Sequence, residues 1–128
     1  MTNSILLRFS LPAVLAAFLA GPAQAHHGWS GYDESKPVTL TGVVKSSGYE
    51  NPHSYVDLQV DEGKGPGTGK LWHAVLAPPS RMEARGITRE AIKPGATLTV
   101  EGLQDRKKPN EAKIERVTIN GKSYEIRQ

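Results

Sequence analysis

The fold is decided by the stretch Ser54-Tyr55-Val56-Asp57-Leu58-Gln59-Val60. Its apolar residues occupy the even positions and alternate with more polar residues at the odd positions, which is the period of a β-strand that buries one face. A glycine-rich segment, residues 61–69, separates it from a second stretch with the same alternation, residues 70–76. We therefore predict an antiparallel hairpin around a flexible glycine-rich loop.

The register of this hairpin follows if Val60 and Lys70 form the pair that flanks the loop. Trp72 then shares the core face with the apolar residues of the first strand, and His73 lies on the opposite face, across from Asp57. A carboxylate in this position can orient an imidazole. His53 also falls on that face, but four residues from Asp57 it would be some ~13 Å away at the usual strand rise.

Strand patterns continue on both sides of the hairpin. Residues 38–44 alternate around Gly42, and a glycine inside a strand is typical of a bulge or a sharp bend. Residues 97–103 form a further strand. Ile114 and Val117 differ in parity within the next one, which indicates a β-bulge.

Two shorter signals complete the order of elements. Pro78-Pro79-Ser80 leads into a short helix over residues 81–85 that Gly86 can end, and Thr88 can cap one further turn through Ile92. Asn120-Gly121 predicts a two-residue hairpin turn near the C-terminus. The order is typical of an all-β fold with one short helix, an OB-like five-stranded barrel over residues 38–128. A small β-sandwich is the alternative.

The first 25 residues have the layout of a secretory signal peptide. Arg8 is their only charged side chain, an apolar run covers residues 11–20, and the small-residue pattern Ala23-x-Ala25 follows. The run is too short to span a membrane. We expect cleavage after Ala25, export to the periplasm, and an extended N-terminal arm over residues 26–37.

Composition narrows the classes of function. Cleavage would leave 128 − 25 = 103 residues, enough for one domain, and would lower the formal charge from +3 to +2. So small a charge, with few aromatic residues to stack on bases, argues against a nucleic-acid partner. There is no cysteine, which excludes disulfides, thiolate metal sites and a cysteine nucleophile. No catalytic motif is present, so we do not expect an enzyme.

The four histidines are the candidate metal ligands: His26, His27, His53 and His73. Cleavage after Ala25 would make His26 the first residue, where its α-amine and its imidazole can chelate one ion together. Nitrogen ligands without thiolates suit Cu(II), Ni(II) or Zn(II), and raw affinity favours copper. The alternative interpretation is that the His pair is solvated and that His53 and His73 are ordinary strand residues.

From these residues we expect a periplasmic copper-binding protein, or one for zinc or nickel, that serves metal storage, delivery or resistance. A periplasmic protein is a possible partner in such a role. The alternative is an OB-type interaction module that binds a protein or an envelope glycan, without metal, through the face that carries Tyr55.

Segments along nearly the whole chain after residue 25 carry a resemblance to a known family: Ala25-His26-His27-Gly28-Trp29, Leu40-Thr41-Gly42-Val43-Val44, Glu50-Asn51-Pro52-His53-Ser54, Leu71-Trp72-His73, Ala77-Pro78-Pro79-Ser80-Arg81 with Arg85-Gly86, and Lys93-Pro94-Gly95. On these segments the chain resembles domain-of-unknown-function family 6152, whose members are small exported bacterial proteins. The resemblance implies export and one β-rich domain, and it assigns no activity.

The first prediction concerns processing. Because the small-residue pattern ends at Ala25, the exported protein should begin at His26. Mass spectrometry of the protein recovered from the periplasm reads this N-terminus directly. A chain that begins at Gln24, or an uncut chain, would remove the chelating amine and most of the argument for a metal.

Overall fold

The computed structural model describes residues 29–61 and 69–127. Within them lie six strands, one α-helix and one 3-10 helix: β1 (Tyr32–Gly48), β2 (Tyr55–Val60), β3 (Leu71–Val75), α1 (Pro79–Ala84), η1 (Arg89–Ile92), β4 (Thr97–Asp105), β5 (Glu111–Ile119) and β6 (Lys122–Glu125). The predicted signal peptide, both N-terminal histidines and most of the predicted glycine-rich loop lie outside these residues.

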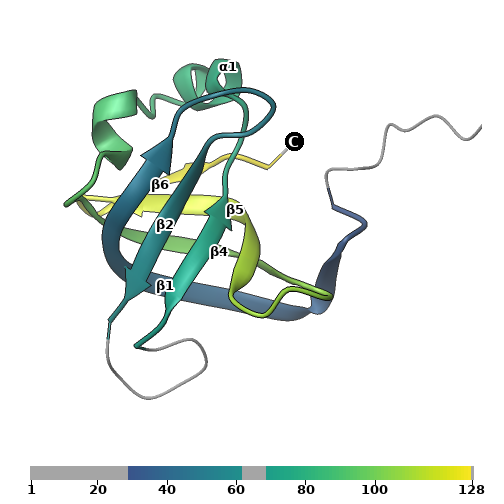
Figure 1. The fold of residues 1–128 in the computed structure, drawn as a ribbon. Coiled ribbons are helices and arrows are strands. Elements are labelled where there is room, and N and C mark those ends of the chain that lie inside the picture. The colour runs from purple at the N-terminus through teal and green to yellow at the C-terminus, as the bar shows by residue number, and fades with distance from the viewer. Residues whose placement is uncertain (1–28, 62–68, 128) are drawn as a thin grey trace, which may run out of the picture.

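Five of the strands form a closed ring. The sheet runs in the order β3-β2-β1-β4-β5-β6, and a further pairing of β3 with β5 closes it. That closing pair is parallel, whereas the other neighbours are antiparallel. Figure 1 shows α1 and η1 together at one end of the ring. The prediction of a mostly β fold with one short helix is confirmed; the sheet has six strands, of which five form the ring, and the described residues form one sheet and not the two sheets of a sandwich.

The central hairpin has the predicted register. Asp57 pairs with His73 and Leu58 pairs with Trp72, as expected if Val60 and Lys70 flank the loop. Trp72 is only 3% exposed, whereas His73 is on the outer face. The alternation of apolar residues therefore predicted both the pairing and the buried side.

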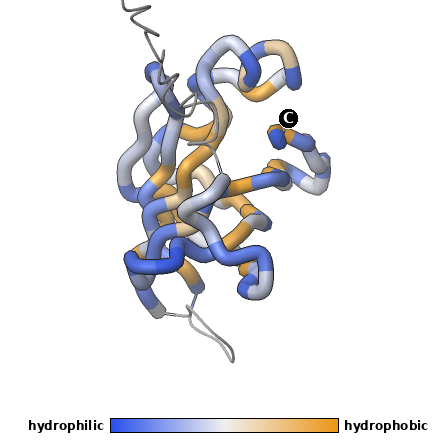
Figure 2. Tube along the Cα trace, turned by 90° about the vertical axis from the view of Figure 1, so that its right-hand side faces the viewer, coloured by the Kyte–Doolittle hydropathy of each residue, from blue (hydrophilic) through white to orange (hydrophobic). Residues whose placement is uncertain are grey.

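The core fills the inside of the ring. Figure 2 shows hydrophobic segments gathered there and hydrophilic ones toward the outer turns. Helix α1 contributes Met82 and η1 contributes Ile92, both fully buried, so the two helices close the end of the ring on which they lie. The largest fully buried side chains come from β1, β2, β4 and β5 and from segments outside the strands: Leu40, Leu58, Leu76, Met82, Ile87, Ile92, Leu98, Ile114 and Ile126.

Strand β1 starts earlier than the sequence indicated. It begins at Tyr32, not at Val38, because residues at the end of the predicted arm pair with β4: Tyr32 lies opposite Asp105 and Pro37 opposite Leu103. The boundary between arm and domain that we drew at Val38 therefore falls inside a strand. The polar composition of residues 32–37 concealed this pairing, since both faces of the segment are largely exposed.

The glycine in β1 was expected to mark a bulge or a sharp bend. The structure has a bulge in β1, but it lies three residues after Gly42. Gly42 pairs with Val60 on one side and with Leu98 on the other, and a Cβ there would lie 1.9 Å from the carbonyl oxygen of Gln59. The register shift falls between Val44 and Ser46. Gly42 is therefore required by the close approach of two backbones.

Of the remaining local predictions, those of the β5 bulge and the two glycine turns agree with the structure, and that of the Thr88 cap does not. The register of β5 shifts between Ile114 and Arg116, which is the predicted bulge. Asn120 and Gly121 both have positive φ, as a primed hairpin turn requires. Gly86, with φ of 90°, follows α1, which begins at Pro79, two residues before the predicted start. Thr88 is at the N-cap position of η1 but makes no side-chain cap hydrogen bond, so the predicted cap is wrong. No helix in the described part of the chain has the length and apolar character to cross a membrane.

The register leads to a second prediction, which compares adjacent residues on opposite faces. Trp72→Ala should lower the free energy of unfolding by about 3–5 kcal/mol, as large-to-small changes in a core do. His73→Ala should cost far less, because its side chain is 41% exposed. Urea unfolding of the two variants measures both effects. Equal losses would contradict the assignment of faces.

Candidate functional site

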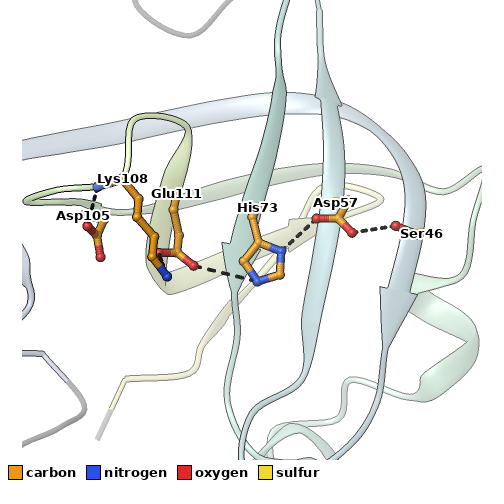
Figure 3. A network of polar contacts seen from close by, with 6 residues as sticks. All are labelled: Ser46, Asp57, His73, Asp105, Lys108 and Glu111. Carbon is orange, nitrogen blue, oxygen red and sulfur yellow. Dashed lines mark hydrogen bonds and ion pairs between the residues drawn. The ribbon is translucent and has the colours of Figure 1, made fainter.

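The candidate site is centred on His73, on the outer face of β3. Its Nδ1 lies 2.8 Å from Oδ1 of Asp57 on β2. Because a carboxylate only accepts hydrogen bonds, Nδ1 carries the proton and donates it. The hydroxyl of Ser46 donates to the other oxygen of Asp57 at 2.6 Å. Three neighbouring strands thus orient the imidazole, as Figure 3 shows.

The second ring nitrogen of His73 faces a different strand. Its Nε2 lies 3.9 Å from Oε1 of Glu111, at the start of β5. The parallel pairing that closes the ring places these two residues opposite each other, and the N–H of His73 donates to the carbonyl of Asn110 at 2.9 Å. With Nδ1 protonated, Nε2 is the nitrogen whose lone pair is available to a ligand.

Glu111 is a site residue that the sequence did not reveal. Nothing in its local pattern distinguishes it from other surface acids, and only the contact between β3 and β5, 38 positions apart in the chain at this pair, brings it to His73. The only feature of the sequence that could have indicated Glu111 is that an acidic residue stands at the start of a predicted strand. That signal is too common to have selected this residue.

Further charged groups surround Glu111. Lys108 Nζ lies 3.6 Å from its Oε2. The backbone N–H of Lys108 donates to Asp105 at 2.7 Å and is the largest of several causes that hold the pKa of Asp105 below its ordinary range. A hydrogen bond with Glu111 acts on that pKa in the same direction. Glu111 thus lies between the imidazole of His73 and the ammonium of Lys108, with Asp105 next to Lys108.

Two tyrosines flank the site. The ring of Tyr55 packs against His73 with a centroid distance of 5.2 Å. Burial, and to a smaller extent the charges of Glu111 and Asp105, raise the pKa of Tyr32 to about 12. The influence of both carboxylates on Tyr32 places the start of β1 beside the site.

Trp29, the first residue described, lies beside the same strand. Lys113 Nζ lies 5.2 Å from the centroid of its ring and Arg127 Cζ lies 4.3 Å from it. Lys113 is only 7% exposed. Burial lowers the pKa of Lys113, and the charge of Arg81 lowers it further.

The predicted metal ligands are only partly brought together. His26 and His27 lie outside the described residues. His53 precedes β2, four residues from Asp57 along the chain, and its Nδ1 is buried. Among residues 29–61 and 69–127 no group of three His, Asp or Glu residues is arranged to hold a metal ion. The described chain thus offers His73 and Glu111 as a pair of donors, and further ligands would have to come from elsewhere.

Comparison with known proteins gives a family but no activity. A protein-family model described as a family of unknown function (DUF6152) matches residues 14–113. The matched region contains every site residue named above except Arg127. No curated protein and no solved structure matches the chain.

The third prediction uses the pKa of Tyr32 in the metal-free protein. A phenol whose pKa rises on folding, from 10.0 to about 12, contributes stability below pH 10 that is lost as the pH rises through 12. Spectrophotometric titration should therefore show a phenolate that forms near pH 12, and Tyr32→Phe should remove that step. The variant should also lose less stability than the wild type above pH 10. If Tyr32→Phe removed a phenolate step near pH 10 and not the one near pH 12, the buried position of Tyr32 beside two acids would be contradicted.

Proposed function

The chain belongs to the family of unknown function DUF6152, and from the site itself we propose that it is a periplasmic protein that binds a divalent transition metal, with Cu(II) as the first candidate and zinc or nickel as alternatives. The role that fits such binding is storage, delivery or resistance, without catalysis. The mature chain would begin at His26 after removal of the signal peptide.

The observation that carries this proposal is the oriented imidazole of His73. Metal-bound histidines characteristically donate their second ring N–H to a carboxylate, which fixes the tautomer and the direction of the ring. Asp57 accepts this bond at 2.8 Å and is itself held by Ser46. Its Nε2 lies 3.9 Å from a carboxylate oxygen of Glu111, which is below the ~4.0–4.4 Å that two ligands of one ion can be apart at most with bonds near ~2.0–2.2 Å.

The chain can supply the missing ligands from its N-terminal arm. Trp29 packs on Lys113, which is two residues from Glu111 on the same face of β5, or about 7 Å at the usual strand rise. His26 precedes Trp29 by three residues, which span at most about 10 Å when extended. We propose that the α-amine and imidazole of His26 bind the same ion as His73 and Glu111, with His27 as a further donor.

The proposed ligand set is thus His26, with two nitrogens, His73 and Glu111, with His27 as an additional donor. Nitrogen donors with one carboxylate suit Cu(II), Zn(II) and Ni(II). His53 has no role in this set, because its Nδ1 is buried and its position is remote from Asp57 along the strand.

A second candidate function is an interaction module. Leu71, 50% exposed, is the large hydrophobic side chain left open to solvent in the described residues, and it shares the outer face of β2 and β3 with Tyr55. A protein or an envelope glycan could bind this face without any metal. The two functions are distinguished by whether the N-terminal amine matters.

The fourth prediction is that the N-terminus and His73 act together. Adding one residue before His26 should weaken Cu(II) binding by several orders of magnitude although every histidine remains, and His26→Ala should do comparable damage, since the two-nitrogen chelate is lost. His73→Ala should weaken binding less than either change. Asp57→Asn should weaken it about 10–100-fold, because it removes the group that orients the imidazole. Calorimetric titration at neutral pH measures all four.

His53→Ala is the matched control, since it removes a histidine that precedes β2 and is outside the proposed ligand set, and it should leave the affinity unchanged. Equal affinities of the native and extended proteins would show that the free amine is irrelevant, and the interaction module would then be the better proposal. Loss of binding in His53→Ala, with His73→Ala unaffected, would move the site to the other end of β2.

A further inference from the structure

Lys113, on β5, is the only charged residue that the described part of the chain buries, with 7% of its surface exposed. Its ladder neighbours are Leu103 on β4, which is 6% exposed, and the half-buried Val75 on β3. Residues opposite each other in a ladder point to the same face, so the side chain of Lys113 lies between apolar ones. A charge in such surroundings is costly unless a partner of opposite charge offsets it.

Lys113 has no such partner in the part of the chain that the structure describes, where no carboxylate forms an ion pair with its ammonium group. The acids two residues away in either direction along β5 are paired with other cations. Glu111 pairs with Lys108 at 3.6 Å, and Glu115 pairs with Arg127. The side chain of Lys108 is 73% exposed. The fold therefore pairs this exposed lysine with an acid and leaves the buried lysine without a counter-charge.

A second cation without an acid partner lies close to Lys113. Arg81, on α1, is half-buried, and its charge lowers the pKa of Lys113 beyond the effect of burial. Among the described residues no acid pairs with the guanidinium group of Arg81. Two positive charges near each other, one of them largely removed from water, create a region of positive potential that attracts an anion.

The indole of Trp29 compensates the charge of Lys113 only in part. The Nζ atom of Lys113 lies 5.2 Å from the ring centroid, within the range of a cation–π contact. The same ring also contacts the guanidinium of Arg127, whose Cζ lies 4.3 Å from the centroid. An aromatic ring carries no net charge, so the positive charges of Lys113 and Arg81 remain without an opposite charge. Trp29 and Arg81 are both half-buried, so solvent reaches the rim of this region.

We propose that Lys113 and Arg81 form a binding site for the oxyanion group of a small ligand, a carboxylate or a phosphate, with the indole of Trp29 at its edge. A guanidinium binds such a group through paired N–H donors, and an ammonium adds a point charge with further donors. The ligand supplies the counter-charge that the described residues do not. Anion binding here requires no metal ion, so it is independent of the proposed metal-binding function and can be tested in the metal-free protein.

The two tryptophans of the chain give a local readout of binding. The metal-free protein is titrated with inorganic phosphate and separately with succinate, at an ionic strength held constant with sodium chloride, and NMR follows the indole N–H signals. The signal of Trp29 should shift and saturate with at least one of the two anions, whereas that of Trp72, 3% exposed in the core, should shift less. The anion that binds more tightly identifies the class of ligand. Absence of saturation with both anions would overturn the proposal.

A matched set of variants separates this site from a general effect of positive charge. Lys113→Met and Arg81→Met should each weaken binding of the tighter anion about tenfold or more, since each removes hydrogen bonds between charged groups. Lys122→Met is the control, because it also removes a lysine that contacts an aromatic ring, that of Tyr124 at 5.1 Å, but from an exposed position on β6. It should leave the affinity unchanged. Equal weakening in all three variants would overturn the proposal.

The stability of the variants separates anion binding from a purely structural role of the lysine. Without added anion, Lys113→Met should be at least as stable as the wild type, because it removes a buried charge that lacks an acid partner. A saturating concentration of the tighter anion should raise the unfolding temperature of the wild type but not that of the variant. Equal gains in both proteins would overturn the proposal. If Lys113→Met does not fold, as judged by circular dichroism, Arg81→Met, which changes a half-buried side chain, takes its place.

Discussion

The close approach of β1 to two neighbouring strands is the constraint on which the rest of the fold depends. Gly42 lies at the point where β1 leaves its pairing with β4 and takes up its pairing with β2, and the backbone of Gln59 occupies the space that a side chain would need. Gly102 has the same role between β4 and β5, where a Cβ would lie 2.0 Å from the carbonyl oxygen of Lys113. Strands that bend this tightly can curl one sheet back on itself.

Closure of the sheet then creates the candidate site. Once β1 has bent, β3 and β5 come together as a short parallel pair, and His73 and Glu111 face each other across it. The orientation of His73 comes from the antiparallel side, through Asp57 and Ser46, whereas its proposed co-ligand comes from the parallel side. The site therefore exists only in the closed ring, with each half rigidly supported by a ladder of backbone hydrogen bonds.

The electrostatic surroundings of the site are mixed in sign. Asp57, Glu111 and Asp105 provide negative charge that favours a cation, while Lys108 lies 3.6 Å from Glu111 and competes with any metal for that carboxylate. The buried Lys113 sits further along the same strand face, beneath Trp29. A cation that bound Glu111 would have to compete with Lys108 for that carboxylate.

The sequence by itself determined what local periodicity controls, and the tertiary structure decided the rest. Alternation along residues 54–60 and 70–76, with Val60 and Lys70 taken as the pair that flanks the loop, was enough to predict the pairing of Asp57 with His73 and the burial of Trp72, because the side chains of a strand change faces at every residue. The bulge in β5 and the turn at Asn120-Gly121 were predictable for the same local reason. Local patterns did not predict the earlier start of β1 or the position of its bulge. They also did not predict the contact of Glu111 with His73 or the contacts of Trp29. Each of these features depends on contacts between residues that are far apart in the chain. The way in which the twisted sheet closes decides those contacts, and the pattern within one segment does not reveal them.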